Sequence, residues 1–260
     1  MPELTGLAWV MLVAGALIIG LSKAALPGAT TIAVALFAAV LPAKQSTGTI
    51  LVLLIVGDLF ALWAYRRHAD IPALLKLAPA VVAGLLLGAL FLALASDAGV
   101  RKTIAVILLV LVAITLWRRF VAARAVAGAD AVVPAVAPTA GAPRRVTAAV
   151  YGALGGFTTM VANAGGPVMS MYFLAARFPV KAFLGTAAWF FATVNIIKLP
   201  FSIGLGLLTL PGLLIDLVLI PGVIIGAFAG RWIAGRISQR VFEWIVIALT
   251  IVGALYLLVL

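Results

Sequence analysis

The sequence contains no cysteine, and only 10% of its 260 residues are charged. The absence of cysteine excludes disulfides, thiolate metal ligands and a cysteine nucleophile. With seven acidic residues and one histidine, the chain also lacks paired acidic motifs for hydrolysis or phosphoryl transfer. No Gly-rich phosphate loop ending in Gly-Lys-Ser/Thr is present. We therefore expect neither an enzyme nor an ATP-driven pump, and no cofactor or metal.

Hydrophobic residues make up 66% of the chain, and the mean hydropathy is +1.31. This composition cannot form a water-soluble globule with a polar shell, and it predicts an integral membrane protein. The net charge of +11 comes from Lys and Arg residues that lie mostly between apolar runs. Such a distribution is typical of anchoring and orientation in a lipid bilayer. We expect the bilayer as a partner and no nucleic acid.

Gly and Pro interrupt two of the apolar runs, at residues 22–29 and 159–167. A helix has to end and restart at each break, and the first break places Lys23 well inside a hydrophobic stretch. Irregular backbone at membrane depth is tolerated only where protein buries it or where it lines a wet cavity. The two breaks are therefore predicted to face each other at a substrate site.

The two halves of the chain are similar to each other. An offset of 137 residues superimposes the pattern Pro-x-Lys-x-x-x-Gly-Thr beginning at Pro42 on the same pattern beginning at Pro179, and it places Asp58 on Asn195. The matching breaks follow the same offset. We interpret residues 1–118 as a first transmembrane repeat, 119–145 as a linker containing Arg and Pro, and 146–260 as a second repeat.

The positive charges predict a topology, because short cytoplasmic loops are enriched in Lys and Arg. If each broken segment returns to its starting side, one face holds 13 of these residues and the other holds 4; if each crosses once, the split is 9 to 8. The first arrangement places both termini outside and the linker in the cytoplasm. It predicts an all-α membrane protein of two inverted repeats, each with a broken or re-entrant helical hairpin and three transmembrane helices, as in secondary transporters.

Lys23 is the most informative residue, since a cation at this depth costs roughly 2.5 to 3.5 kcal/mol on insertion scales. It either binds an anion, or it extends to a lipid headgroup or pairs with a carboxylate. An anion site is favoured by the helix predicted to begin nearby, because unpaired N–H groups at a helix N-terminus attract negative charge. The residues we expect at the two helix starts are Gly28, Thr30 and Thr31 in the first repeat and Asn163, Gly165 and Gly166 in the second.

Asp58 lies centrally in its predicted span and has two interpretations. It is a buried partner of Lys23, or it couples transport to protons by releasing that partner when protonated. Its counterpart Asn195 keeps hydrogen-bonding capacity and lies one turn from Lys198. Lys198 lies nearer a membrane edge, so we weigh substrate contact against extension to the interface. For Asp216, close to the end of its span, we expect an interfacial position or an arginine partner.

These motifs resemble the TauE/SafE family of membrane permeases, the sulfite-exporter family. The resemblance rests on the broken first helix, the duplicated pattern, Gly-Gly-Pro ending at Pro167, and the segment Asn-Ile-Ile-Lys-Leu-Pro beginning at Asn195. In the first half, Leu-Pro-Gly-Ala stands where the family has a glycine cluster. The resemblance implies outward transport of sulfite, sulfoacetate or another organosulfonate across the bacterial inner membrane.

We therefore predict a secondary transporter that exports a small sulfur-containing anion by alternating access, with proton coupling through Asp58 as a further hypothesis. One alternative is a passive anion channel, which would show neither proton coupling nor counterflow. An intramembrane enzyme is the other alternative, and it lacks suitable catalytic residues in the sequence.

Overall fold

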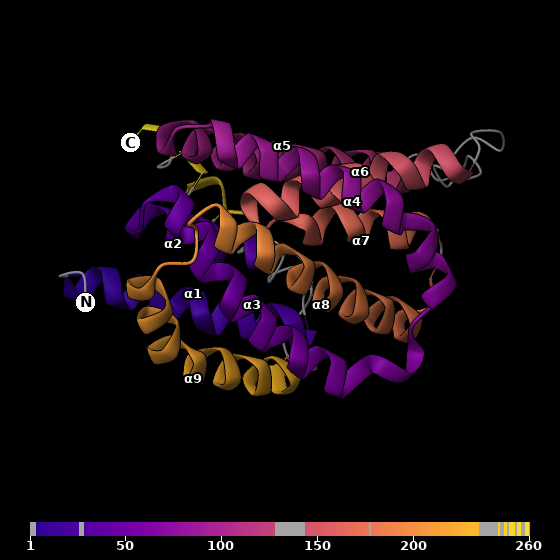
Figure 1. Cartoon of the computed structure of the whole chain (residues 1–260). Helices are drawn as coiled ribbons and strands as arrows, with labels where there is room; N and C mark the ends of the chain where they lie inside the picture. Colours follow the sequence, from indigo (N-terminus) through magenta and orange to yellow (C-terminus); the bar gives the residue numbers. More distant parts are fainter. Residues whose placement is uncertain are drawn as a thin grey trace.

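The computed structural model describes residues 4–25, 29–127, 144–176 and 178–233, together with isolated residues from 244 onward. The continuous ranges form helices joined by short connections, with no strand among them (Figure 1). The helices are α1 (Gly6–Ala25), α2 (Thr30–Val40), α3 (Ala43–Tyr65), the 3₁₀ turn η1 (Arg66–His68), α4 (Ile71–Leu94), α5 (Asp97–Ala127), α6 (Arg144–Ala162), α7 (Gly165–Ala175), α8 (Val180–Gly204) and α9 (Leu210–Ile233).

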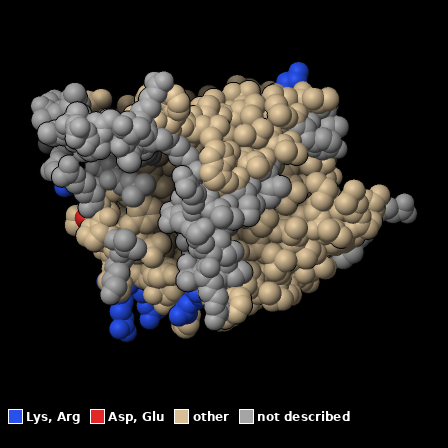
Figure 2. Space-filling model, turned by 180° about the vertical axis from the view of Figure 1, so that it is seen from behind, with Lys and Arg blue, Asp and Glu red and all other residues tan. Residues whose placement is uncertain are grey.

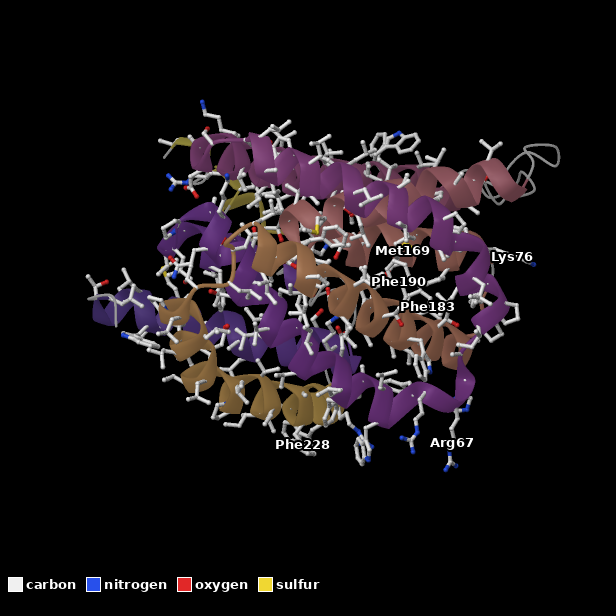
Figure 3. All side chains as sticks on the ribbon, in the orientation of Figure 1. Arg67, Lys76, Met169, Phe183, Phe190 and Phe228 are labelled. Atoms are coloured by element: carbon white, nitrogen blue, oxygen red, sulfur yellow. The ribbon has the colours of Figure 1, made fainter. Side chains whose placement is uncertain are left out.

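In the described part of the chain, six helices are long and apolar enough to cross a membrane. Each backbone N–H and C=O must be satisfied inside a lipid-facing segment, so a long apolar run adopts a helix. Among the residues drawn in colour in Figure 2, most are uncharged, and the Lys and Arg side chains lie near the margins of the view. Phe228 on α9 is 57% exposed and points away from the bundle (Figure 3). Apolar side chains on this outer surface match a lipid environment, and the protein is a multi-pass membrane protein.

Helices α3 and α8 pack against each other in opposite directions. A Cβ atom added to Gly48, near the start of α3, would overlap the carbonyl group of Leu207, just after α8. A Cβ added to Gly185, near the start of α8, would lie 2.8 Å from the carbonyl oxygen of Tyr65 at the end of α3. The absence of a side chain at both glycines lets each helix start approach the other helix's end.

Two further pairs, α1 with α9 and α4 with α6, pack tightly through glycine and alanine. A Cβ at Gly226 of α9 would overlap the backbone of Leu17 in α1, and one at Gly84 of α4 would overlap the backbone of Ala153 in α6. Small residues allow such close approach where van der Waals contact, rather than water exclusion, holds helices together. Helix α9 of the second half thus packs on the first helix of the first half, and its counterpart α4 packs on α6, the first helix of the second half.

The helix bounds recur at the offset found in the sequence. Helix α3 begins at Ala43 and α8 begins 137 residues later at Val180; α1 ends at Ala25 and α6 ends 137 residues later at Ala162. Within the segment 119–145 that we interpret as the linker, α5 continues to Ala127 and α6 begins at Arg144, while residues 128–143 lie outside the described part.

Both predicted breaks fall between helices. In the second, α6 ends at Ala162, Asn163 has a positive φ of 51°, and α7 begins at Gly165. Asn tolerates this left-handed conformation better than most residues, which allows the chain to reverse within two residues. In the first break, α1 ends at Ala25 and α2 starts at Thr30. The predicted site residue Gly28 lies outside the described residues.

Candidate functional site

Lys23 lies in the last turn of α1, and its ammonium contacts the middle of α3. The Lys23 Nζ atom donates a hydrogen bond to Asp58 Oδ1 at 2.5 Å, and it lies 4.6 Å from the centroid of the Phe191 ring in α8. The side chain of Lys23 is 10% exposed and that of Asp58 is 2% exposed. This pairing supplies the compensation that a cation at membrane depth requires.

Asp58 also joins α3 to α8, because its second oxygen accepts a hydrogen bond from Asn195 Nδ2 at 2.6 Å. These are the two residues that the 137-residue offset superimposes, so equivalent positions of the two halves meet each other. Both residues are buried. The carboxylate therefore has an ion partner on one oxygen and an amide donor on the other.

Lys198 is completely buried, and the expected alternative of extension to the membrane interface is wrong. Its ammonium donates to the Thr159 carbonyl oxygen at 2.7 Å and to Asn163 Oδ1 at 2.6 Å, with a longer contact of 3.4 Å to Asn195 Oδ1. All three acceptors are neutral. Lys198 thus ties α8 to the end of α6 and to the second break.

Asn163 connects that break to the other half of the protein. Its side-chain oxygen accepts the hydrogen bond from Lys198, and its Nδ2 donates to the Thr47 carbonyl oxygen in α3 at 3.0 Å. Asn163 therefore has two roles. Its backbone reverses the chain, and its side-chain amide fixes this turn by bridging α8 and α3.

A small cavity of about 50 Å³ opens beside these groups. Polar atoms from Lys23 and Asp58 face it, together with residues from both breaks, and α8 closes one wall with Phe191. The lining residues are Ser22, Lys23, Thr30, Leu54, Asp58, Ala61, Tyr65, Thr159, Asn163, Gly166, Leu184, Ala187, Ala188, Phe191 and Asn195. Residues 137 positions apart, and both broken segments, therefore line one cavity.

The starts of α2 and α7 reach the cavity through one residue each, Thr30 and Gly166. Ala29 at the start of α2 has no side chain that could cap the helix. The N–H of Ile32 donates to the Ala29 carbonyl oxygen at 3.0 Å. An N-terminal turn of this kind attracts negative charge through its remaining N–H groups. The Thr30 hydroxyl is 2.8 Å from the Ser22 hydroxyl across the first break. This contact holds the end of α1 against the start of α2.

Three predicted residues lie close to the cavity without lining it. Thr31 is directed elsewhere, with its hydroxyl 3.0 Å from that of Thr250. A Cβ added to Gly165 would lie 2.8 Å from Thr159 Cβ, so glycine permits close packing there. Lys198 donates hydrogen bonds to Thr159 and Asn163, which do line the cavity. The six predicted residues that do line the cavity are Lys23, Thr30, Asp58, Asn163, Gly166 and Asn195.

Sequence reasoning missed Thr47, whose carbonyl oxygen accepts the hydrogen bond from Asn163. Its hydroxyl also lies 3.3 Å from the Val161 carbonyl oxygen at the end of α6. Its place in the duplicated pattern, directly before Gly48, was the only indication in the sequence. A hydrogen bond to a backbone carbonyl does not require a particular residue type, so the sequence does not reveal it.

Of three comparisons with known proteins, one found a match. The sequence model of the family described as "Sulfite exporter TauE/SafE" matches residues 12–257, nearly the whole chain. Searches of the curated proteins and of the solved structures returned no match. The matched region includes both broken segments and the residues that line the cavity. The chain belongs to the TauE/SafE family of sulfite exporters.

Proposed function

We propose that the protein is a secondary transporter that exports a small sulfur-containing anion, such as sulfite, sulfoacetate or another organosulfonate, across the bacterial inner membrane. The observation that carries this proposal is the cavity beside Lys23, where a buried ammonium faces open space between the two broken segments. Family membership supports a transporter of sulfur anions.

The charges around the cavity favour an anion. Lys23 presents its ammonium at the cavity with Asp58 as its ion partner, and a second lysine, Lys198, donates only to neutral oxygens nearby. Lys23 has a single hydrogen-bond partner among the described residues, Asp58, so further N–H donors can meet a solute. We propose Lys23 as the principal substrate ligand.

The remaining predicted residues take supporting roles in this proposal. Thr30 and Gly166 offer donors from helix starts, while Asn163 and Asn195 bring side-chain amides to the cavity wall. Lys198 acts as a positioning residue, because it holds Asn163 and lies behind the wall. For Gly28, Gly165 and Thr31, substrate contact remains a prediction.

The cavity size favours a compact solute. A volume of about 50 Å³ corresponds to about three or four water positions, so a solute of a few heavy atoms fits it without rearrangement. Among the sulfur anions considered, sulfite matches this size best. Larger organosulfonates require the cavity to widen.

We further propose that the two halves are inverted repeats that alternate access to the cavity. Three observations support this idea: the helix bounds recur at one offset, α3 and α8 run in opposite directions, and Asp58 meets its counterpart Asn195. Equivalent helices that cross near the midplane allow one half to move against the other around a fixed site.

The proposed orientation follows the positive charges. Arg67 and Lys76 lie at one end of the bundle (Figure 3), and Arg231 lies over the ring of Trp63 near the same end, 5.6 Å from its centroid. We place this end in the cytoplasm with the linker, and both termini outside. Tyr65 and Leu184 line the cavity from this end, so the cavity as described faces the proposed cytoplasmic side.

Counterflow in proteoliposomes tests the proposed function. Vesicles loaded with unlabelled sulfite should take up external ³⁵S-sulfite transiently above equilibrium, because a carrier exchanges one solute for another at a single site. Sulfoacetate, taurine and sulfate tested as competitors define the substrate class. Flux without counterflow would instead support an anion channel. No uptake of sulfite or of any of the other solutes would overturn the proposal.

A further inference from the structure

Asp216 lies in α9, and the expectation of an interfacial position or an arginine partner is wrong. The residue is 2% exposed. Neither of its carboxyl oxygens has a hydrogen-bond partner in the described part of the chain. A buried carboxyl group without a donor is costly in a protein interior and more so in a membrane. It therefore requires an explanation beyond packing.

A second buried polar atom lies close by without a partner. The Thr49 hydroxyl of α3 also makes no hydrogen bond in the described residues. A Cβ added to Gly212 of α9 would lie 3.0 Å from this hydroxyl oxygen, and Asp216 follows Gly212 by one helical turn on the same face. The orphaned carboxyl and the orphaned hydroxyl thus occupy one interface, between α3 and α9.

No charged group described on the neighbouring helices neutralises Asp216. Helix α9 packs against α1 and α3, whose ionisable side chains in the described region are Lys23 on α1 and Lys44, Asp58 and Tyr65 on α3. Lys23 and Asp58 pair with each other, and Gly57 lies beside Val223, two turns beyond Asp216. Lys44 and Tyr65 lie at the two ends of α3.

Neutralisation by a metal ion is poorly supported by the available ligands. The polar side chains beside Gly212, one turn before Asp216, are those of Thr49, Thr209 and Gln45. Helical backbone carbonyls on both sides are already used within their helices, so the oxygen donors fall short of the six or more that hard cations prefer. A proton needs only the carboxyl group itself, and it removes the charge without any further ligand.

We infer that Asp216 is a proton-binding site, separate from the Lys23 and Asp58 pair, which holds its proton between α3 and α9 beside Thr49. Loss of the proton would place an unpaired charge in this interface and push the two helices apart or draw in water. Because α9 also contacts α1 through Gly20 and Gly226, such a movement reaches the helix that carries Lys23. The corresponding helix of the first half, α4, contains no acidic residue, so the group is not needed to build the repeat.

Infrared difference spectroscopy of the purified protein tests this site without any substrate, so its outcome is independent of the proposed transport function. A protonated carboxyl group gives a C=O stretching band that shifts in D₂O. The wild-type protein should show this band at neutral pH. The variant Asp216→Asn should lose it, and Asp58→Asn serves as the matched control that keeps it.

Thr49→Val gives a second measurement that does not alter the carboxyl group. We expect the band to persist and to shift in frequency, since a buried hydroxyl of the same helix interface has been removed. A wild-type spectrum without the band would overturn the proposal even if Asp216→Asn failed to fold. A band that persists in Asp216→Asn, or disappears in Asp58→Asn, would assign the proton to another residue and would equally contradict it.

Discussion

Replacement of Lys23 by alanine is expected to lower sulfite transport in proteoliposomes by about 10- to 100-fold. A hydrogen bond to a charged group contributes about 1.5 to 3 kcal/mol, and each 1.4 kcal/mol corresponds to a factor of ten. Lys23 is the lysine that lines the cavity, so no other described ammonium can replace it. Initial rates of ³⁵S-sulfite exchange, normalised to reconstituted protein, provide the measurement.

Loss of Lys23 also leaves Asp58 without its ion partner, which costs about 3 to 5 kcal/mol when the pair is buried. The double variant Lys23→Met with Asp58→Asn removes both charges and separates the two effects. It should recover thermal stability without recovering transport. Lys76→Ala, at an exposed position outside the cavity, is the matched control and should behave as wild type. Full exchange activity in Lys23→Ala would remove this lysine from the site.

Replacement of Asp58 by asparagine is expected to abolish accumulation driven by a pH gradient while sulfite exchange continues. The asparagine keeps an acceptor for Asn195 Nδ2, but it can neither take up a proton nor pair with Lys23. If one proton accompanies each solute, a gradient of one pH unit supports at most about tenfold accumulation, equivalent to 1.36 kcal/mol. The variant should show none.

This measurement compares uptake with and without an imposed pH gradient in the same vesicles. Asn195→Asp provides a matched control, because it adds an ionisable group at the equivalent position of the second half. Accumulation by Asp58→Asn equal to that of wild type would show that coupling, if present, involves another group. Asp216 would then be the next candidate.

The sequence was informative where the two halves could be compared. The common offset placed Asp58 on Asn195, and these residues hydrogen-bond to each other in the structure. The pairing of Asp58 with Lys23, one of the two interpretations of each residue, is confirmed as a contact. The contact between Lys23 and Asp58 could be anticipated because a buried charge requires a partner and the chain offers few acidic residues.

Burial at helix ends could not be predicted in the same way. Lys198 and Asp216 lie near the ends of apolar runs, where single-sequence reasoning places a charged residue at the interface. The structure buries both, because Lys198 of α8 bonds to the second break and α9 packs against both α1 and α3. Such positions depend on how helices pack, and apolar periodicity does not encode the partner of each helix.

The central claim, that an anion binds beside Lys23, can be tested most directly with selenite, an analogue of sulfite that scatters X-rays anomalously at the selenium edge. The chain has no cysteine with which selenite could react. In crystals soaked with selenite, we predict an anomalous peak within hydrogen-bonding distance of Lys23 Nζ, reduced when sulfite is present in excess. A peak only at the protein surface, or a peak at Lys23 that sulfite does not displace, would contradict the account.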